Sequence, residues 1–381
     1  MNSDNPTSKT LKRHIPALDG IRGLAAAWVF IYHYGGGRQS SFLLFRIVGS
    51  IIHLGWIGVP LFFALSGFLI TGILWDSFNK KGWWSRFYIR RSLRIFPLYY
   101  LALSIAAIVF FLSEVKPHVL AGLWVYILYL QNIPLLAPIR SQLPTTIWLG
   151  HFWSLAVEEQ FYLVWPVILY CLARNRLRVM RLIVGLWFLS FAFRLGVIGL
   201  HLSTDWALSS SFGRSGELLT GAYLALLLRG NEMELNQITR RIPLVLYSSL
   251  GSFLILVSYV ISKNFDQIKT DIVMSTLGLA ILSIFFASLI ATSLRDGVIQ
   301  SIFAWAPLRW LGKFSYGIYV YHLLLRSFFD RLTYRLWPGF GYNGHLIALA
   351  CVALVGTLLI SNLSFYAFES PFLHLKDRWH D

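Results

Sequence analysis

The sequence predicts an all-α protein embedded in a membrane, with about ten transmembrane helices and one additional re-entrant or interfacial helix. The chain is 56% hydrophobic and has a mean hydropathy of +0.62. Only 13% of its residues are charged, which is about half the fraction in soluble domains. Its apolar runs reach the roughly 20 residues that a helix needs to cross the hydrocarbon core. They lack the strict alternation of a transmembrane β-barrel, so a helical bundle remains.

The apolar segments can be counted as membrane spans by the charge of the loops between them. Eleven candidates lie near residues 17–35, 53–75, 95–113, 118–136, 151–172, 180–201, 213–229, 242–262, 272–293, 311–330 and 346–368. The most basic loops, 76–94 and 173–181, should both face the cytoplasm, so an even number of crossings must separate them. Three candidates lie between these loops, and the weakest, 118–136, is assigned as the re-entrant or interfacial helix. Ten spans remain.

The even count places both ends of the chain in the cytoplasm. We expect a cytoplasmic tail at 1–14, one transmembrane domain at 15–371 and a short cytoplasmic tail at 372–381. Charged residues interrupt the start of the first apolar run, and no small-residue cleavage site follows it. We therefore expect a retained first helix rather than a cleaved signal peptide.

The net charge of +16 does not indicate a nucleic-acid partner. The positive residues cluster in loops between apolar runs, as the positive-inside rule and attraction to anionic lipid headgroups predict. The two cysteines, Cys171 and Cys351, both lie in apolar runs. Two such thiols form neither a disulfide framework nor a metal site, so we expect them to be small residues of the core.

The first helix carries three polar residues that could serve a site. Arg22 and His33 are eleven positions apart, which is about three helical turns, so they project from one face about 16 Å apart along the axis. Asp19 lies one turn before Arg22. A neutral imidazole is the usual general base near pH 7. The alternative is that Arg22 anchors the helix at the membrane surface and His33 belongs to an aromatic belt.

The segment FYIRRSLRIFPLYY carries three arginines in its first half, at the expected cytoplasmic surface. Arg91 and Arg94 are three residues apart and would be neighbours on one helical face, with Arg90 beside them. Guanidinium groups bind phosphates bidentately, which makes these residues candidate phosphate ligands. The alternative is that they only fix the topology of the helix.

Glu158 and Glu159 are adjacent carboxylates within an apolar segment that begins with His151 and Trp153. A charge inside the bilayer costs several kcal/mol, so both glutamates need partners or a function. Adjacent residues point about 100° apart on a helix. We expect one glutamate to face a cavity while the other binds a neighbouring helix. The alternative is an ion pair with Arg194 or Arg214.

Other polar residues inside apolar segments have plainer interpretations. Ser66 lies in a run of small residues at 55–70, which favours close helix packing. Arg214 and Glu217 are one turn apart and could pair with each other. We expect Glu369, at the end of the last span, to pair with Arg22 or Arg91. One further polar stripe comprises Tyr316, Tyr319 and His322.

In this order the motifs resemble those of the integral-membrane acyltransferases of acyltransferase family three. The matching stretches are Arg22 and His33 with ten residues between them, GVPLFFALSGFLI, FYIRRSLRIFPLYY, HFWSLAVEEQFYLVWP, LGKFSYGIYVYH and FESPF. Each stretch is weak alone, and the ordered set is highly specific. We recognise no extracytoplasmic hydrolase-like domain, so the resemblance is to the stand-alone form.

The resemblance implies transfer of an acyl group, most simply acetyl, from cytoplasmic acyl-CoA to a hydroxyl of a carbohydrate or glycosylated acceptor. Such acceptors include surface polysaccharide, lipopolysaccharide, peptidoglycan, lipo-oligosaccharide and macrolide sugars, and the location implied is the bacterial cytoplasmic membrane. Acyl-CoA is then a substrate, and neither a permanent cofactor nor a metal is expected. An alternative is a transporter or flippase for an acylated or glycosylated lipid, although the repeated halves common in transporters are not evident.

The resemblance also assigns roles to residues of this chain. Arg91 and Arg94, with Arg90, would hold the phosphates of the donor. His33 would deprotonate the acceptor hydroxyl, and Glu158 would orient the imidazole or stabilise the imidazolium. The remaining residues expected in the catalytic site are Asp19, Arg22, Trp153, Ser154, Glu159 and His322.

Overall fold

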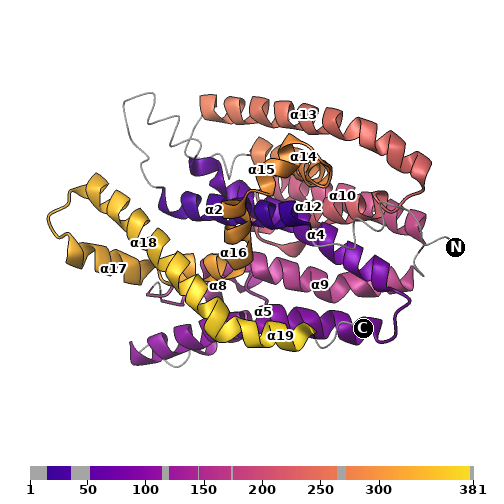
Figure 1. The fold of residues 1–381 in the computed structure, drawn as a ribbon. Helices are drawn as coiled ribbons and strands as arrows, with labels where there is room; N and C mark the ends of the chain where they lie inside the picture. Colours follow the sequence, from indigo (N-terminus) through magenta and orange to yellow (C-terminus); the bar gives the residue numbers. More distant parts are fainter. Residues whose placement is uncertain are drawn as a thin grey trace.

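The computed structural model describes residues 15–35, 52–113, 120–144, 146–172, 175–263 and 272–377 (Figure 1). All regular structure in these ranges is helical. Ten of the helices have 15 or more residues: α2 (Pro16–Tyr34), α4 (Gly58–Ser77), α5 (Trp83–Leu112), α9 (Trp153–Cys171), α10 (Arg176–Gly199), α12 (Ser211–Leu227), α13 (Glu232–Lys263), α14 (Leu279–Ser293), α16 (Ala306–Leu324) and α18 (Tyr342–Ser364). Each corresponds to one predicted span. Six helices of the described part are long and apolar enough to cross a membrane by length and composition. The prediction of an all-α polytopic membrane protein is confirmed.

The segment assigned as re-entrant or interfacial forms only short helices where the structure describes it. These are α7 (Trp124–Ile127), the 3₁₀ helix η2 (Pro134–Leu136) and α8 (Ala137–Arg140). Pro134 and Pro138 explain why these helices are short, since proline removes a backbone donor and interrupts a continuous helix. Part of the segment lies outside the described residues, as do the predicted tail 1–14 and the last four residues of the tail 372–381. The tail is otherwise helical, in α19 (Ser370–Asp377).

Two predicted boundaries differ from the structure. The basic loop expected at 76–94 is largely helical, because α5 begins at Trp83 and continues through the arginines into the apolar run. Arginine has a high helix propensity. The arginines therefore mark where the helix leaves the membrane, but the helix itself continues through them. The span expected at 311–330 ends at Leu324, and α17 (Arg326–Leu336) follows it.

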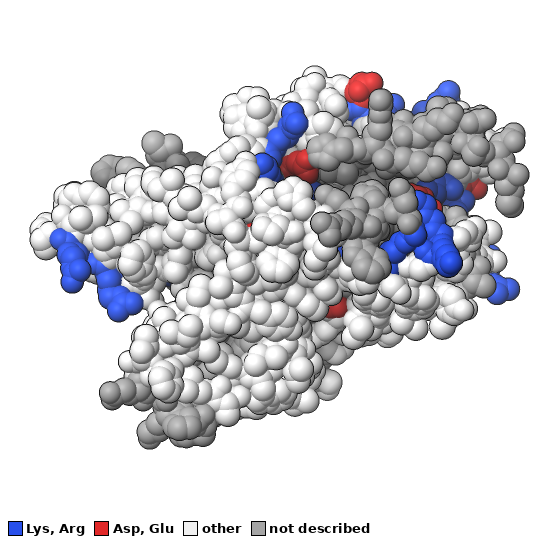
Figure 2. Space-filling model, turned by 60° about the horizontal axis from the view of Figure 1, so that its bottom comes forward, with Lys and Arg blue, Asp and Glu red and all other residues white. Residues whose placement is uncertain are grey.

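The helices divide into a buried centre and an exposed periphery. The apolar windows of Leu54–Ser77 and Met274–Ser293 are 72% buried, whereas those of Arg176–Gly199 and Tyr342–Leu375 are only 22% buried. In Figure 1, α13 follows the upper edge of the molecule and α5 the lower edge, with α2 and α4 between them. On the face in Figure 2, a broad uncharged surface separates groups of Lys and Arg at opposite ends. This is the pattern of a helical bundle in lipid.

The two cysteines show that hydropathy alone does not identify the core. Cys171 and Cys351 are both exposed, so the expectation that they are core residues was wrong. In a membrane protein the lipid-facing surface is as apolar as the interior. A cysteine in an apolar run can therefore lie on either one.

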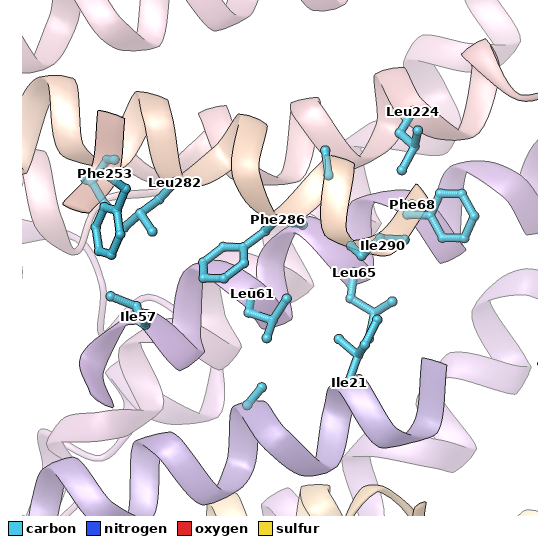
Figure 3. Packing of buried hydrophobic residues seen from close by; sticks show 14 of the residues in the cluster. Ile21, Ile57, Leu61, Leu65, Phe68, Leu224, Phe253, Leu282, Phe286 and Ile290 are labelled. Atoms are coloured by element: carbon cyan, nitrogen blue, oxygen red, sulfur yellow. The ribbon is translucent and has the colours of Figure 1, made fainter. Parts of the chain in front are cut away.

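The centre is held by close helix contacts and apolar packing. Ile21 of α2 packs against Leu61 and Leu65 of α4, and Phe286 and Ile290 of α14 lie against the same cluster (Figure 3).

Glycines allow α4 to approach α12 closely. A Cβ atom on Gly67 would lie 1.9 Å from the carbonyl oxygen of Leu218, and one on Gly221 would lie 1.9 Å from that of Ala64. The prediction that small residues in 55–70 permit close packing is confirmed.

Candidate active site

A first cavity lies between α2, α4, α5, α9 and α16, and we call it the arginine cavity. Its volume is about 100 Å³. Its charged lining residues are Arg22, Arg91, Arg94, Glu158 and Glu159. Five charged side chains from three helices thus meet in one small space inside an otherwise apolar bundle. Such a concentration of charge favours binding of a charged ligand over a purely structural role.

The arginines of this cavity are held by neighbouring side chains. The Nη1 atom of Arg22 lies 2.9 Å from Oδ1 of Asp19, one turn earlier on α2. The Cζ atom of Arg91 lies 5.3 Å from the centre of the Tyr162 ring, within the range of a cation–π contact. Arg90 is not among the lining residues. Of the three arginines expected to bind phosphate, the structure brings Arg91 and Arg94 to the cavity.

Both glutamates line the arginine cavity, so the expectation that only one would do so was wrong. Ser66 of α4 donates a hydrogen bond of 2.6 Å to Oε1 of Glu158. The Oε1 atom of Glu159 is buried and has no hydrogen-bond partner in the part of the chain that the structure describes. The packing interpretation of Ser66 was therefore incomplete, because this serine also fixes a carboxylate of the cavity.

The arginines proposed as alternative partners of the glutamates are engaged elsewhere. Nη2 of Arg214 lies 2.8 Å from Oε1 of Glu217, and Nη1 of Arg194 donates to the carbonyl oxygen of Gly213 at 3.0 Å. The alternative of a structural ion pair with Glu158 or Glu159 thus loses support.

A second cavity, which we call the histidine cavity, has a volume of about 550 Å³. It lies between α2, the start of α4, the 3₁₀ helix η3 (Gly150–Phe152), α12 and α16. Its polar and aromatic lining residues are Tyr32, His33, Trp56, Trp148, His151, Trp153, Arg214, Tyr319 and Arg326. His33 thus faces a cavity rather than a wholly apolar surface, as the site interpretation requires.

The hydrogen bonds of His33 determine which of its ring nitrogens can act as a base. Nδ1 lies 2.8 Å from the carbonyl oxygen of Val29 and 3.2 Å from Nε2 of His322. A carbonyl oxygen only accepts, so Nδ1 of a neutral His33 carries the hydrogen. Nδ1 of His322 lies 2.7 Å from the carbonyl oxygen of Tyr319, so it is also the protonated nitrogen, and Nε2 of His322 accepts from His33. This network leaves the lone pair of His33 on Nε2.

The structure does not bring Glu158 and His33 together, although the sequence predicted that they would act as a pair. Glu158 lines the arginine cavity, whereas His33 lines the histidine cavity. The ring beside His33 is that of His322, with ring centres 5.0 Å apart. His322, fully buried at 1% exposure, occupies the position that the prediction gave to a carboxylate.

The two cavities meet at Val59 and Tyr319, which line both. The hydroxyl of Tyr319 donates to the carbonyl oxygen of His151 at 2.8 Å and is also hydrogen-bonded to Ser154. Ser154 lines the arginine cavity, and Trp153, the preceding residue, lines the histidine cavity. The start of α9 therefore forms part of the boundary between the cavities.

Glu369 does not form the ion pair that the sequence suggested. Its Oε1 atom accepts a hydrogen bond of 3.2 Å from Ser364, five residues earlier in the chain. Among the described residues, no group of three or more His, Cys, Asp or Glu side chains is placed to hold a metal ion.

Sequence reasoning gave no site role to several residues of the histidine cavity, including His151 and Trp56. His151 was placed only at the start of an apolar segment and Trp56 was given no role, yet both line the cavity with 5% of their surface exposed. His151 lies at the start of the segment that contains the two glutamates, and this proximity was a usable signal. Trp56 carried no comparable signal.

Comparison with known proteins identifies relatives over nearly the whole chain. The model of the acyltransferase-domain family matches residues 15–362. The chain is 28% identical to peptidoglycan O-acetyltransferase OatA of Listeria monocytogenes, over 96% of this chain and 57% of that protein. It is 29% identical to the putative peptidoglycan O-acetyltransferase YrhL of Bacillus subtilis, over 94% of this chain and 55% of that protein. It is 26% identical to a putative O-acetyltransferase of Staphylococcus aureus, over 98% of this chain and 59% of that protein. The chain thus spans little more than half the length of these relatives, and no solved structure matches it.

Proposed function

This chain belongs to the acyltransferase-domain family, and from that membership we propose that it is a membrane O-acetyltransferase acting on a carbohydrate. The donor is acetyl-CoA, and the acceptor is a hydroxyl of a cell-surface glycan, with peptidoglycan favoured by the names of two relatives. The location is the bacterial cytoplasmic membrane, with both ends of the chain in the cytoplasm. The basic loops identified in the sequence support this orientation.

One observation carries the proposal: a basic cavity and an imidazole-lined cavity adjoin at Val59 and Tyr319. The donor phosphates lie toward Arg91 and Arg94, where guanidinium groups can bind them bidentately. The acceptor hydroxyl lies against His33. Arg22 and His33 are about 16 Å apart along α2, so an extended pantetheine arm can carry the thioester from one cavity toward the other.

The reaction needs one base and one acid, and a single imidazole supplies both. Nε2 of His33 accepts the proton of the acceptor hydroxyl while its oxygen attacks the thioester carbonyl. Collapse of the tetrahedral intermediate breaks the carbon–sulfur bond, and the leaving thiolate takes the proton back from the imidazolium. The products are an O-acetyl ester and free coenzyme A. Base assistance of this kind is worth about 10²–10⁴-fold in rate.

His322 takes the orienting role in this mechanism. Its Nε2 atom accepts from Nδ1 of His33, so it holds the ring in the tautomer that has its lone pair on Nε2. It also stabilises the imidazolium, whose Nδ1–H becomes a stronger donor. Glu158 instead belongs to the donor side, where its carboxylate lies among the arginines.

The proposal is tested with membranes that contain the protein, acetyl-CoA labelled in the acetyl group, and soluble glycan fragments. We expect base-labile label on the glycan, released as acetate by mild alkali, and none with membranes that lack the protein. Movement of unmodified glycan across the membrane, without label on it, would instead favour the transporter alternative.

A further inference from the structure

Apart from Nη2 of Arg214, which lies 2.8 Å from Oε1 of Glu217, three nitrogen atoms of residues that line the histidine cavity are buried and have no hydrogen-bond partner among the described residues. They are Nε1 of Trp56, Nδ1 of His151 and Nε of Arg214. The three residues come from different elements, and their exposed fractions are 5%, 5% and 1%. Buried polar atoms are normally hydrogen-bonded, since an unmade bond costs stability. Three such atoms around one cavity indicate a ligand that would complete them.

The hydrogen-bonding capacity of each nitrogen follows from its surroundings. The indole nitrogen of Trp56 and Nε of Arg214 can only donate. Nε2 of His151 lies 3.2 Å from the carbonyl oxygen of Val320, so it carries the hydrogen of the neutral ring. Nδ1 of His151 is then an acceptor. The cavity therefore offers two donors and one acceptor, which suits a molecule with several hydroxyl groups.

Arg214 is held rigidly and its charge is compensated. Its Cζ atom lies 5.4 Å from the ring centre of Phe63 and 5.5 Å from that of Trp153. Its Nη2 atom pairs with Glu217 at 2.8 Å. A guanidinium already paired with a carboxylate gains less from a second anion than an unpaired one does. It still offers Nε–H to an uncharged oxygen.

Aromatic residues make up much of the remaining lining, which also includes Arg326 and the apolar residues Val29, Val59 and Leu323. Tyr32, Trp148 and Trp153 line the cavity together with the three polar residues. Aromatic faces bind apolar surfaces, and their negative quadrupole attracts polarised C–H groups. A pyranose ring presents such C–H groups on its faces and hydroxyl groups around its edge. The cavity volume of about 550 Å³ falls within the range of small-molecule sites.

We propose that the histidine cavity is a sugar subsite, in which Trp56, His151 and Arg214 bind the hydroxyl edge of an uncharged pyranose. This inference rests on the proposed function and adds how the acceptor is recognised. His151 accepts a hydrogen bond from one sugar hydroxyl, and Trp56 and Arg214 donate to its oxygens. Another hydroxyl of the same ring then lies against Nε2 of His33.

The first test uses the unaltered protein in lipid nanodiscs and compares two alcohols. Methyl β-D-glucopyranoside and cyclohexylmethanol both offer a primary hydroxyl on a six-membered ring, but only the glucoside has further hydroxyls. We expect a KM at least about tenfold lower for the glucoside, since a buried nitrogen left unpaired is costly. Equal KM values would overturn the sugar subsite while leaving acetyl transfer intact. Absence of transfer to every alcohol, glycan fragments included, would instead reject the proposed function.

The second test uses His151 to separate binding from structure. His151→Gln keeps a donor near Nε2 for Val320 and removes the acceptor at Nδ1, so KM for the glucoside should rise about tenfold. His151→Asn places an amide oxygen near Nδ1 and loses the Val320 bond, so its KM should stay within about threefold. KM for acetyl-CoA should not change in either. If the Asn variant is the more damaged, His151 is structural and the proposal fails.

A third variant tests the indole nitrogen. Trp56→Phe should raise KM for the glucoside about five- to tenfold and leave KM for acetyl-CoA unchanged. Trp305→Phe is the matched control, because Trp305 is 61% exposed and lies away from both cavities. An unchanged KM in Trp56→Phe would overturn its role, as would an equal rise in the control.

Discussion

The two cavities have opposite chemistry although one helix contributes to both. The arginine cavity gathers three guanidinium groups and two carboxylates. The histidine cavity gathers imidazoles and indoles with two arginines: Arg214, which is paired with Glu217, and Arg326, which donates to the carbonyl oxygen of His33. α2 provides Arg22 to the first and His33 to the second. This difference supports the proposed division, in which the charged donor binds in the arginine cavity and the hydroxylated acceptor in the histidine cavity.

The two cavities adjoin at Tyr319, so substrates bound in them could meet there. Tyr319 lines both, and its hydrogen bonds to Ser154 and to the backbone of His151 tie α16 to the start of α9. A ligand can therefore span the boundary without the two binding chemistries mixing. Substitutions in one cavity should then change the kinetics of one substrate only.

The largest effect is expected from His33→Ala. It removes the base and should lower kcat about 10²–10⁴-fold, while KM for acetyl-CoA stays unchanged because the arginine cavity is intact. Labelled-acetyl transfer in membranes with matched protein abundance measures both values. His374→Ala is the control and should retain full activity, because His374 is an exposed residue of α19 and lines neither cavity. Substantial turnover by His33→Ala would contradict the assigned base.

Substitution of His322 should have the next largest effect and separates orientation from packing. His322→Leu removes the acceptor for Nδ1 of His33, and we expect kcat to fall about 10- to 100-fold, the cost of an unmade buried hydrogen bond. His322→Gln places an amide oxygen near Nε2 and should restore most of this loss. Equal kcat values in the two variants would show that His322 does not orient the base.

Arginine substitutions should act on the donor alone. Arg91→Gln and Arg94→Gln should each raise KM for acetyl-CoA about tenfold, as expected for a lost charge-assisted hydrogen bond, with little change in KM for the acceptor. Arg90→Gln is the matched control, because Arg90 lies on the same helix but does not line the cavity. A comparable rise of this KM in the Arg90 variant would show that the effect comes from the charge of the surface in general and not from the cavity.

The smallest effect is expected from Ser66→Ala. This change removes the donor to Glu158 and leaves the carboxylate less well placed, so KM for acetyl-CoA should rise about fivefold. KM for the acceptor should not move, since Ser66 does not line the histidine cavity. An effect on the acceptor alone would break the division between the cavities.

The fold could be predicted further than the site. Length and hydropathy predicted the positions of the ten long helices. An apolar segment in lipid must satisfy its backbone hydrogen bonds internally, and a helix does so within one segment. The spacing of Arg22 and His33 on one helix could be read directly, as could the pair of Arg91 and Arg94. His322 was expected in the catalytic site, but its direct contact with His33 could not be predicted, because the two residues are 289 positions apart.

The chemistry of neighbouring residues also gave wrong predictions where a side chain had several candidate partners. Glu158 was a reasonable candidate to orient an imidazole, since carboxylates often do so, yet it lies among arginines and accepts from Ser66. Arg90 was inseparable from Arg91 and Arg94 by sequence. Only the rotation of α5 against α2, α4 and α9 decided which arginines reach the cavity.

The sequence by itself determined a helical membrane bundle, the spacing of residues within each helix and the family resemblance. Hydropathy, helical periodicity and ordered motifs are local properties of the chain, so they need no knowledge of helix packing. The tertiary structure decided which imidazole meets His33 and that Glu158 lines the arginine cavity. It also decided that Trp56 and His151 face one cavity, because such contacts depend on how helices far apart in sequence are rotated and packed.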